Sequence, residues 1–324
     1  MDTNQQQAIL ALLQLPRVGR KTARKVLAGC GSLPVTAADL SHVLTDARAE
    51  LGRIPEFSQN DIAAAFREAN LIMERCERMS IGVHIVHSTS SQNWIAKMNA
   101  IPDAPAILFS RGAIDALEEP CVTVIGTRKP TSWGHAAAEK VASRCVAKGF
   151  CVVSGLATGC DAAAHQGALQ AKGRTVAVLA HGLDIVHPEH HKQLATEIAE
   201  ESGCLVSEYA PGVAPQRGSF VERDRLQSAI GSAVIVIETG VQGGTNHTVS
   251  FAKEQNRSIG CLVHPENLAN HRSVQGNKKI LDEGAFPIGS KQDLIEFLES
   301  HTKIESCEEI VSSDQRAPKQ DSLF

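Results

Sequence analysis

Gly126, Arg128 and Lys129 lie in a turn directly after the apolar run 121–125, and these residue types at this spacing suit phosphate binding. An arginine can hold a phosphate through two parallel N–H bonds, and a helix that begins after the turn adds unpaired backbone N–H groups. Gly126 would let the backbone approach the ligand. The alternative is an arginine on a solvated turn. The motif predicts a phosphate-bearing ligand, and whether that ligand is a mononucleotide or a nucleic acid stays open.

Two later turns repeat this arrangement of an apolar run, a turn of small residues and a helix-forming stretch. Their predicted ligand-binding residues are Ser154 and Gly155 in the second turn, and Gly243, Gly244 and Thr245 in the third. A parallel sheet with crossover helices places such turns at the carboxyl ends of its strands. We therefore expect all three turns to converge on one crevice.

A basic segment with one aromatic ring, residues 216–226, is a second kind of candidate, expected just before a helix. Its members are Arg217, Phe220, Arg223 and Arg225. Clustered arginines beside a ring fit a nucleic-acid backbone with one stacked base. The alternative is a solvated basic face, and it stays open because Glu222 and Asp224 lie in the same stretch.

Several acidic and histidine side chains could be catalytic, but each has a structural alternative. Asp161 and His165 lie four residues apart on a predicted helix, where a pair that fixes the loop is favoured over a catalytic pair. Glu208 and Glu238 follow strands and are expected to hydrogen-bond loop amides rather than act as acids or bases. The histidines within 187–191 do not predict a metal site, because adjacent histidines rarely bind one ion.

The remaining sequence supplies the elements that must position these residues. Further strand-like runs lie at 83–86, 106–109, 175–180, 204–209, 234–238 and 259–264. They alternate with helix-forming stretches, which predicts an α/β fold with a doubly wound, mostly parallel sheet. Residues 5–75 instead show helical periodicity, with one helix beginning near the N-cap candidate Ser58. We expect a small all-helical domain over 1–80, the sheet domain over 81–300 and a flexible tail over 301–324.

The composition of the 324 residues limits the classes of function. A net charge of −4 excludes a general nucleic-acid-binding surface, so any such site must be a local basic patch. Nine scattered cysteines without a CxxC pair fit a reducing cytoplasm better than a disulfide framework or a zinc site. No apolar run approaches the roughly 20 residues that span a membrane. We expect a cytoplasmic protein with no metal and no cofactor.

Five motifs, in order, resemble the DNA-processing protein A family, also called DprA or Smf. They are GTRKPTSWG (126–134), SGLATGCDAAAH (154–165), GLDIVHP (182–188), GCLVSEYAPGVAPQRGSFVERDR (203–225) and SVQGNKKILDEGA (273–285). The resemblance implies an extended Rossmann-like domain behind the helical one. It also implies a DNA pocket built from Gly126, Arg128, Ser154, Gly155, Arg223 and Arg225, with Phe220 nearby.

The chain departs from the family pattern at several positions. The usual FPxRNR is FVERDR, which places the acid Asp224 inside the DNA motif, and the usual YP is His187-Pro188. The usual Ser-Gly before a late helix is replaced by the stretch 243–248. Residues 15–23 separately resemble a helix–hairpin–helix, a module whose hairpin amides bind DNA phosphates, with Arg17 at the first of its usual glycines. A basic hairpin used for packing is the alternative.

The resemblance implies a homodimer without enzymatic activity that binds and protects single-stranded DNA and loads a RecA-type recombinase in DNA processing and transformation. A role in phage defence is one alternative. Another is a nucleotide sensor or a phosphoribohydrolase-like enzyme of the same Rossmann group. Gly243, Gly244 and Thr245 resemble part of the PGGxGTxxE motif of those hydrolases, but Gln242 replaces the proline and the required glutamate is missing.

The last residues, Gln320, Leu323 and Phe324, resemble the peptide by which polymerases and repair factors dock on the DNA sliding clamp. In that peptide the glutamine binds at the rim of a pocket, and the leucine and phenylalanine fill an apolar cleft. Asp321 replaces the favoured leucine, so we expect weak binding. A chance match, or a tail that folds back onto its own domain, is the alternative.

Overall fold

The computed structural model of the chain describes residues 3–87, 92–201 and 203–301. Most of the predicted tail, with Gln320, Leu323 and Phe324, lies outside these described residues. Within the described ranges, no helix is long and apolar enough to cross a membrane.

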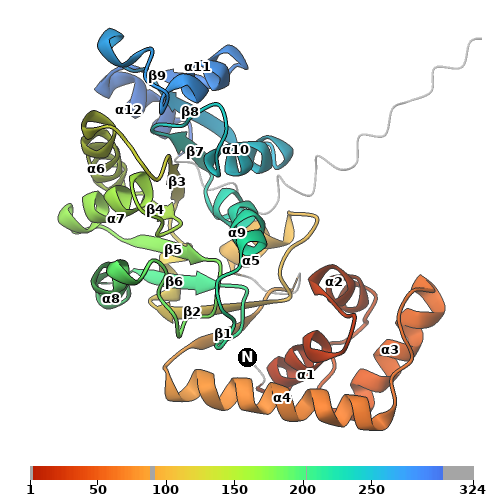
Figure 1. Cartoon of the computed structure of the whole chain (residues 1–324). Helices are drawn as coiled ribbons and strands as arrows, with labels where there is room; N and C mark the ends of the chain where they lie inside the picture. Colours follow the sequence, from red (N-terminus) through yellow and green to blue (C-terminus); the bar gives the residue numbers. More distant parts are fainter. Residues whose placement is uncertain (1–2, 88–91, 202, 302–324) are drawn as a thin grey trace, which may run out of the picture.

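Nine strands form one sheet in the order β1-β2-β6-β5-β4-β3-β7-β8-β9 (Figure 1). Their bounds are β1 Gly82–Ile85, β2 Ile107–Gly112, β3 Cys121–Ile125, β4 Cys151–Ser154, β5 Thr175–Leu179, β6 Cys204–Ser207, β7 Ala233–Val236, β8 Ser258–Leu262 and β9 Phe286–Ile288. Strands β3 to β9 are parallel, whereas β1 pairs with β2, and β2 with β6, in antiparallel register. The predicted doubly wound, mostly parallel α/β fold is confirmed, and the short β9 is a strand that the sequence analysis missed.

Helices cover both faces of this sheet. Their bounds are α1 Thr3–Gln14, α2 Arg20–Ala28, α3 Ala37–Leu51, α4 Gln59–Arg78, α5 Asn93–Asn99, α6 Ser132–Ala147, α7 Cys160–Gln170, α8 Lys192–Glu200, α9 Arg217–Ile230, α10 Thr245–Glu254, α11 Gln275–Asp282 and α12 Lys291–Glu299. In β7, Ile235 packs with α6, α7 and α12, whereas Val234 and Val236 pack with α10 and α11 on the opposite face. Strands buried on both faces explain why their sequences read as continuous apolar runs.

The N-terminal helices pack beside the antiparallel edge of the sheet (Figure 1). Ser58 caps α4, as predicted from the sequence, and the structure adds a capping box with Asp61. One apolar core joins these helices to β1 and β2, and Ile9 and Phe109 both belong to it. In the predicted hairpin between α1 and α2, Arg17 has a φ of 65°, so a non-glycine residue keeps the left-handed turn where a glycine is usual.

The order of the strands changes direction between β3 and β7. From β3 the chain adds β4, β5 and β6 on one side, after which α9 leads back to β7 on the other side of β3. In open α/β sheets, ligands bind outside the carboxyl ends of the strands at such a switch point. Two of the three Gly-rich turns follow these two strands, and the third follows β4, the other neighbour of β3.

The segment with the three arginines is not a loop before a helix, as predicted, but the first part of α9 itself. Arg217 is the first residue of α9, and Arg223 and Arg225 lie more than one turn inside it. A helix turns its side chains in different directions, so these arginines cannot all face one ligand.

Candidate nucleic-acid interface

A cavity of about 780 Å³ lies at the switch point of the sheet, and we call it the cleft. The turn after β3, the segment 239–248 after β7 and the first half of α9 contribute most of its lining. The predicted ligand-binding residues that line it are Gly126, Arg128, Arg217, Phe220, Arg223, Gly243, Gly244 and Thr245. The tertiary structure thus brings together eight predicted residues from three separate sequence segments.

The Gly-rich turns are held against one another by close backbone packing. Thr127 donates its backbone N–H to the Glu238 carbonyl at 2.7 Å, and Cys160 donates its N–H to the Thr127 carbonyl at 3.2 Å. A side chain at Gly126 would come within 2.5 Å of the Cys160 Sγ. Gly126 is therefore required for the contact between turns, a reason that differs from the predicted approach of a ligand.

Arg128 and two rings form the rim of the cleft. Arg128 is exposed, and its guanidinium carbon lies 5.5 Å from the centre of the Phe220 ring. The His187 ring lies 5.7 Å from the Phe220 ring and also lines the cleft. A cation and aromatic rings at one opening are the groups that contact the backbone and bases of a single strand.

The floor of the cleft is polar and comes mainly from α9. Arg223 donates through Nη1 to the carbonyls of Gly155 and Val178, and its Nε lies 3.2 Å from Asp224 Oδ1. With its amide oriented to suit its neighbours, Gln227 donates to Asp224 Oδ1 at 3.0 Å and accepts from the Gly155 N–H at 2.7 Å. Arg223 therefore lines the cleft while most of its donors are bound to the protein.

Asp224 is an acidic group in a buried position, with 7% of its surface exposed. Burial, together with the nearby Asp161 carboxylate, raises the pKa of Asp224 to about 6, and Arg223 opposes this rise. At neutral pH the Asp224 carboxylate is therefore ionised although it is buried at the floor of the cleft, which destabilises the fold. Ionisable groups with shifted pKa values of this kind are typical of binding sites.

We predict that Asp224→Asn stabilises the protein at alkaline pH. Because the folded pKa is raised above the unfolded value of 3.8, the wild type loses stability as the pH rises from about 4 through 6. The variant lacks this loss, so it should gain about 1–3 kcal/mol at pH 8 and much less at pH 4.5. Urea unfolding at both pH values measures the difference. A gain that does not depend on pH would contradict the assignment to this carboxyl group.

Four predicted ligand-binding residues do not line the cleft. Lys129 is exposed beside it, Gly155 packs under Arg223, and Ser154 is fully buried and donates its hydroxyl to the Val124 carbonyl at 2.7 Å. Arg225 is only 1% exposed. The Ser154 and Arg225 side chains therefore make internal contacts and do not face a ligand.

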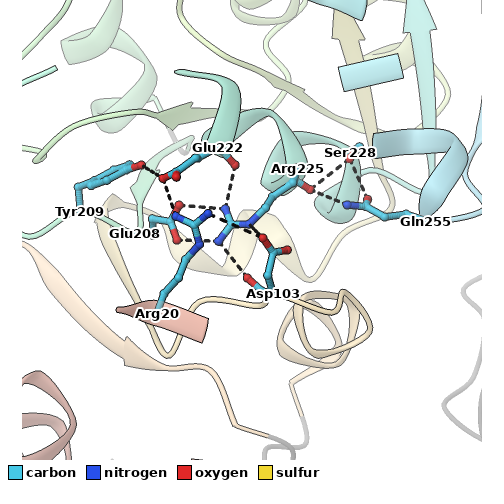
Figure 2. A network of polar contacts seen from close by, with 8 residues as sticks. All are labelled: Arg20, Asp103, Glu208, Tyr209, Glu222, Arg225, Ser228 and Gln255. Carbon is cyan, nitrogen blue, oxygen red and sulfur yellow. Dashed lines mark hydrogen bonds and ion pairs between the residues drawn. The ribbon is translucent and has the colours of Figure 1, made fainter. Parts of the chain in front are cut away.

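Arg225 is the centre of a charge network that joins α9 to three other parts of the chain (Figure 2). It donates to both Glu208 oxygens, at 2.9 and 2.7 Å, and its Nε pairs with Asp103 at 3.1 Å. Nearby, Arg20 of α2 binds Glu222 of α9 at 2.5 Å, and Tyr209 donates to the same carboxylate at 3.0 Å. The Arg20 hydrogen bond lowers the pKa of the Glu222 carboxyl group.

The other acidic residues considered for catalysis are bound to the protein frame. Asp161 accepts the backbone N–H groups of Gly155 and Ala157, so this residue fixes the loop as expected. His165 does not share that role, because its ring hydrogen-bonds Thr175 instead. Glu238 is fully buried and accepts from the N–H and hydroxyl of Thr131, so the expectation of loop binding is confirmed there as well. For Glu208 that expectation is wrong, because its partner is the Arg225 guanidinium.

Histidines are spread over separate sites. His191 hydrogen-bonds the Leu156 carbonyl at 2.8 Å, His165 bonds Thr175 at 2.7 Å, and His187 lines the cleft. In the part of the chain that the structure describes, no group of three or more histidine, cysteine or acidic side chains is gathered around a possible metal position.

A family model described as DNA recombination-mediator protein A matches residues 85–299. This chain belongs to that family. Protein Smf of Synechocystis is 37% identical over 199 residues, which are 60% of this chain and 49% of that protein. The DNA processing protein DprA of Bacillus subtilis is 33% identical over 214 residues, 64% of this chain and 69% of that one. The chain spans about half the length of the Synechocystis and Mycobacterium tuberculosis relatives that it matches.

Two solved structures of the DNA recombination-mediator protein A family share this architecture. DNA processing protein A from Streptococcus pneumoniae has a TM-score of 0.71 and 26% identity, over 91% of this chain and 97% of that one. DNA processing protein A from Helicobacter pylori, described for its single-stranded DNA binding mode, has a TM-score of 0.60 and 25% identity, over 68% of this chain and 97% of that one. The first match extends over most of the chain, including part of the helical region.

Sequence reasoning missed several lining residues of this family member. Pro215, Gln216 and Gln242 lie within or beside quoted motifs, but none of them was predicted to line the site. Gln227 follows Asp224 by three residues, so recognition of α9 as a helix would have placed both side chains on one face. His187 is considered in the sequence as a metal ligand and as a replacement for a family tyrosine, but not as part of the site, although its ring belongs to the rim.

Proposed function

We propose that this chain binds single-stranded DNA in the cleft, and that it acts as a recombination mediator without enzymatic activity of its own. The observation that carries the proposal is the rim, where Arg128 lies over Phe220 beside a Gly-rich turn at the switch point. The relative from Helicobacter pylori, described for its binding of single-stranded DNA, supports the same ligand class.

Charge and shape of the cleft agree with this ligand. The exposed cations that line it, Arg128 and Arg217, lie at its opening, while the acids Asp161 and Asp224 lie buried. Phosphates would bind at the basic opening and beside Gly243 and Gly244, which are exposed at the N-terminus of α10. Phe220 and His187 offer ring surfaces for bases, which stack without regard to sequence.

Fluorescence anisotropy of labelled oligo-dT across a salt series tests the proposal. We expect binding that weakens as salt rises, because each phosphate contact releases counterions. Oligo-dT that stays unbound at low salt, where such contacts are strongest, would contradict the proposed function.

Arg128→Ala should reduce the affinity for oligo-dT by about 1–3 kcal/mol, the range for a hydrogen bond to a charged group. The fold should be retained, because the side chain is exposed on a turn. Lys129→Ala is the matched control, since Lys129 is a neighbouring exposed cation that does not line the cleft. Equal losses for the two variants would show that only the general charge of the turn matters.

Loading of a RecA-type recombinase follows from family membership and is part of the proposal. Its test is the rate at which a recombinase forms filaments on protein-coated single-stranded DNA, with and without this chain. Faster filament formation that Arg128→Ala abolishes would connect the cleft to loading. No change in the rate would leave DNA binding as the function and remove the mediator role.

A homodimer and a docking contact with the DNA sliding clamp complete the proposal. Light scattering at micromolar concentration would show the dimer. Anisotropy of a labelled peptide of residues 310–324 against purified clamp would show the contact, with Leu323→Ala/Phe324→Ala as its control. Equal signals from the two peptides would remove the clamp from the proposal.

A further inference from the structure

The floor of the cleft offers an unusual hydrogen-bonding group to whatever enters it. The protein donors around Asp224, Arg223 Nε and the Gln227 amide, both bind its Oδ1 atom. Among the described contacts, Oδ2 has no protein donor, and the residue lines the cleft. Oδ2 is thus an acceptor on the wall of the cleft that a ligand can reach, and a ligand that supplies N–H groups would complete its hydrogen bonding.

Phosphate does not meet this requirement. An ionised carboxylate is an acceptor only, and the Asp161 carboxylate lies close enough to raise the Asp224 pKa further. A phosphate at this depth would face the Asp161 and Asp224 carboxylates, and the arginine there, Arg223, is already bound to Asp224 and to two backbone carbonyls. Arg128 and Arg217 at the opening instead attract a phosphate. The sugar-phosphate chain is therefore expected at the opening, with a base directed toward the floor.

The four bases differ in how well they suit a carboxylate. Guanine presents two adjacent donors, N1–H and the N2 amine. These can bind the two oxygens of a carboxylate, or both can bind the same oxygen. Thymine presents a single N3–H between two carbonyl oxygens, and these would be repelled. Adenine and cytosine each present one amine beside a ring acceptor. The volume of about 780 Å³ is ample for one purine nucleotide between the floor and the rings of Phe220 and His187.

We propose that Asp224 makes the cleft selective for a base with adjacent N–H donors, so that guanine is preferred over thymine in the bound single strand. This inference rests on the proposed binding of single-stranded DNA and specifies which base occupies the floor. Gln227 and Arg223 act as positioning residues, because they orient the carboxylate through its other oxygen.

The test compares labelled oligonucleotides of about 12 nucleotides, one all thymine and others in which every second thymine is replaced by guanine or by hypoxanthine. Lithium buffer at pH 8 suppresses guanine quadruplexes and keeps Asp224 ionised. We expect the guanine strand to bind about fivefold or more tightly than oligo-dT, the low end for a bidentate base contact. Hypoxanthine keeps N1–H but lacks the amine, so its strand should lie between the two.

Asp224→Asn should abolish the preference for the guanine strand over the hypoxanthine and thymine strands, since the amide offers one donor and one acceptor in place of two acceptor oxygens. Asp46→Asn removes the same charge at an exposed position on α3 and should keep the wild-type order. Equal affinities of the wild type for all three strands, or a guanine preference that survives in Asp224→Asn, would overturn the inference and leave the proposed function intact. Failure of every strand to bind would instead remove the proposed function, and the inference with it.

Discussion

Arg225→Ala should cost about 3–5 kcal/mol of unfolding free energy, the range for removing one partner of a buried ion pair. The side chain is 1% exposed and binds both oxygens of Glu208, whose own side chain is 6% exposed, as well as Asp103. Alanine would leave the Glu208 carboxylate buried without its main cation. The variant should therefore unfold at much lower urea concentration than the wild type.

Arg217→Ala is the matched control, because Arg217 is exposed at the start of the same helix and lines the cleft. It should lower the affinity for DNA and leave the stability nearly unchanged. The reverse pattern, a stable Arg225→Ala protein with weakened DNA binding, would restore the role that the sequence resemblance gave to Arg225. The stability of Arg225→Lys should lie between that of the wild type and that of Arg225→Ala, since lysine keeps the charge but cannot bind both carboxylate oxygens in the paired geometry of arginine.

Gly159→Ala should cost about 2–5 kcal/mol, from two effects at one residue. Gly159 has φ 85° and ψ −125°, a region that other residues avoid at a cost of about 1–3 kcal/mol. A methyl group would also overlap the Thr127 carbonyl oxygen and the Arg128 backbone. The overlap adds the usual cost of overpacking, about 1–3 kcal/mol, or displaces the turn that carries Arg128.

Gly149→Ala separates these effects, because Gly149 has a similar φ of 81° but open space where the methyl group would lie. We expect it to cost about 1–2 kcal/mol, from the left-handed backbone alone, and to leave DNA affinity unchanged. Gly159→Ala should cost clearly more and also weaken binding of oligo-dT. Equal losses of stability from the two substitutions would show that the contact between the turns contributes little.

The arginines of α9 differ in their surroundings and therefore in their roles. Arg217 is free to meet a phosphate, Arg223 lines the cleft but is bound to two backbone carbonyls, and Arg225 is enclosed in the charge network. Asp224 lies between Arg223 and Arg225 in the sequence, and its carboxylate adds a hydrogen-bond acceptor to the floor of the cleft. The first nine residues of α9 thus include some that serve stability and some that serve ligand contact.

The sequence by itself determined the α/β fold, the mostly parallel sheet and the meeting of three Gly-rich turns at one cleft. These features depend on local periodicity and on the general rule that turns after parallel strands share one edge, so no distant partner has to be known. The same local rules identified the N-cap Ser58 and the loop-fixing role of Asp161.

Only the tertiary structure decided which predicted residues face the cleft. Arg225 pairs with Glu208, 17 residues away, and with Asp103, 122 residues away, and nothing in the local pattern indicates either contact. Position 126 requires glycine because Cys160, in another turn, occupies the space that a side chain would need. The Asp224 carboxyl is buried because α9 crosses back over the sheet. Burial and charge pairing depend on neighbours that are distant in the chain, and these set the orientation and the pKa of a side chain.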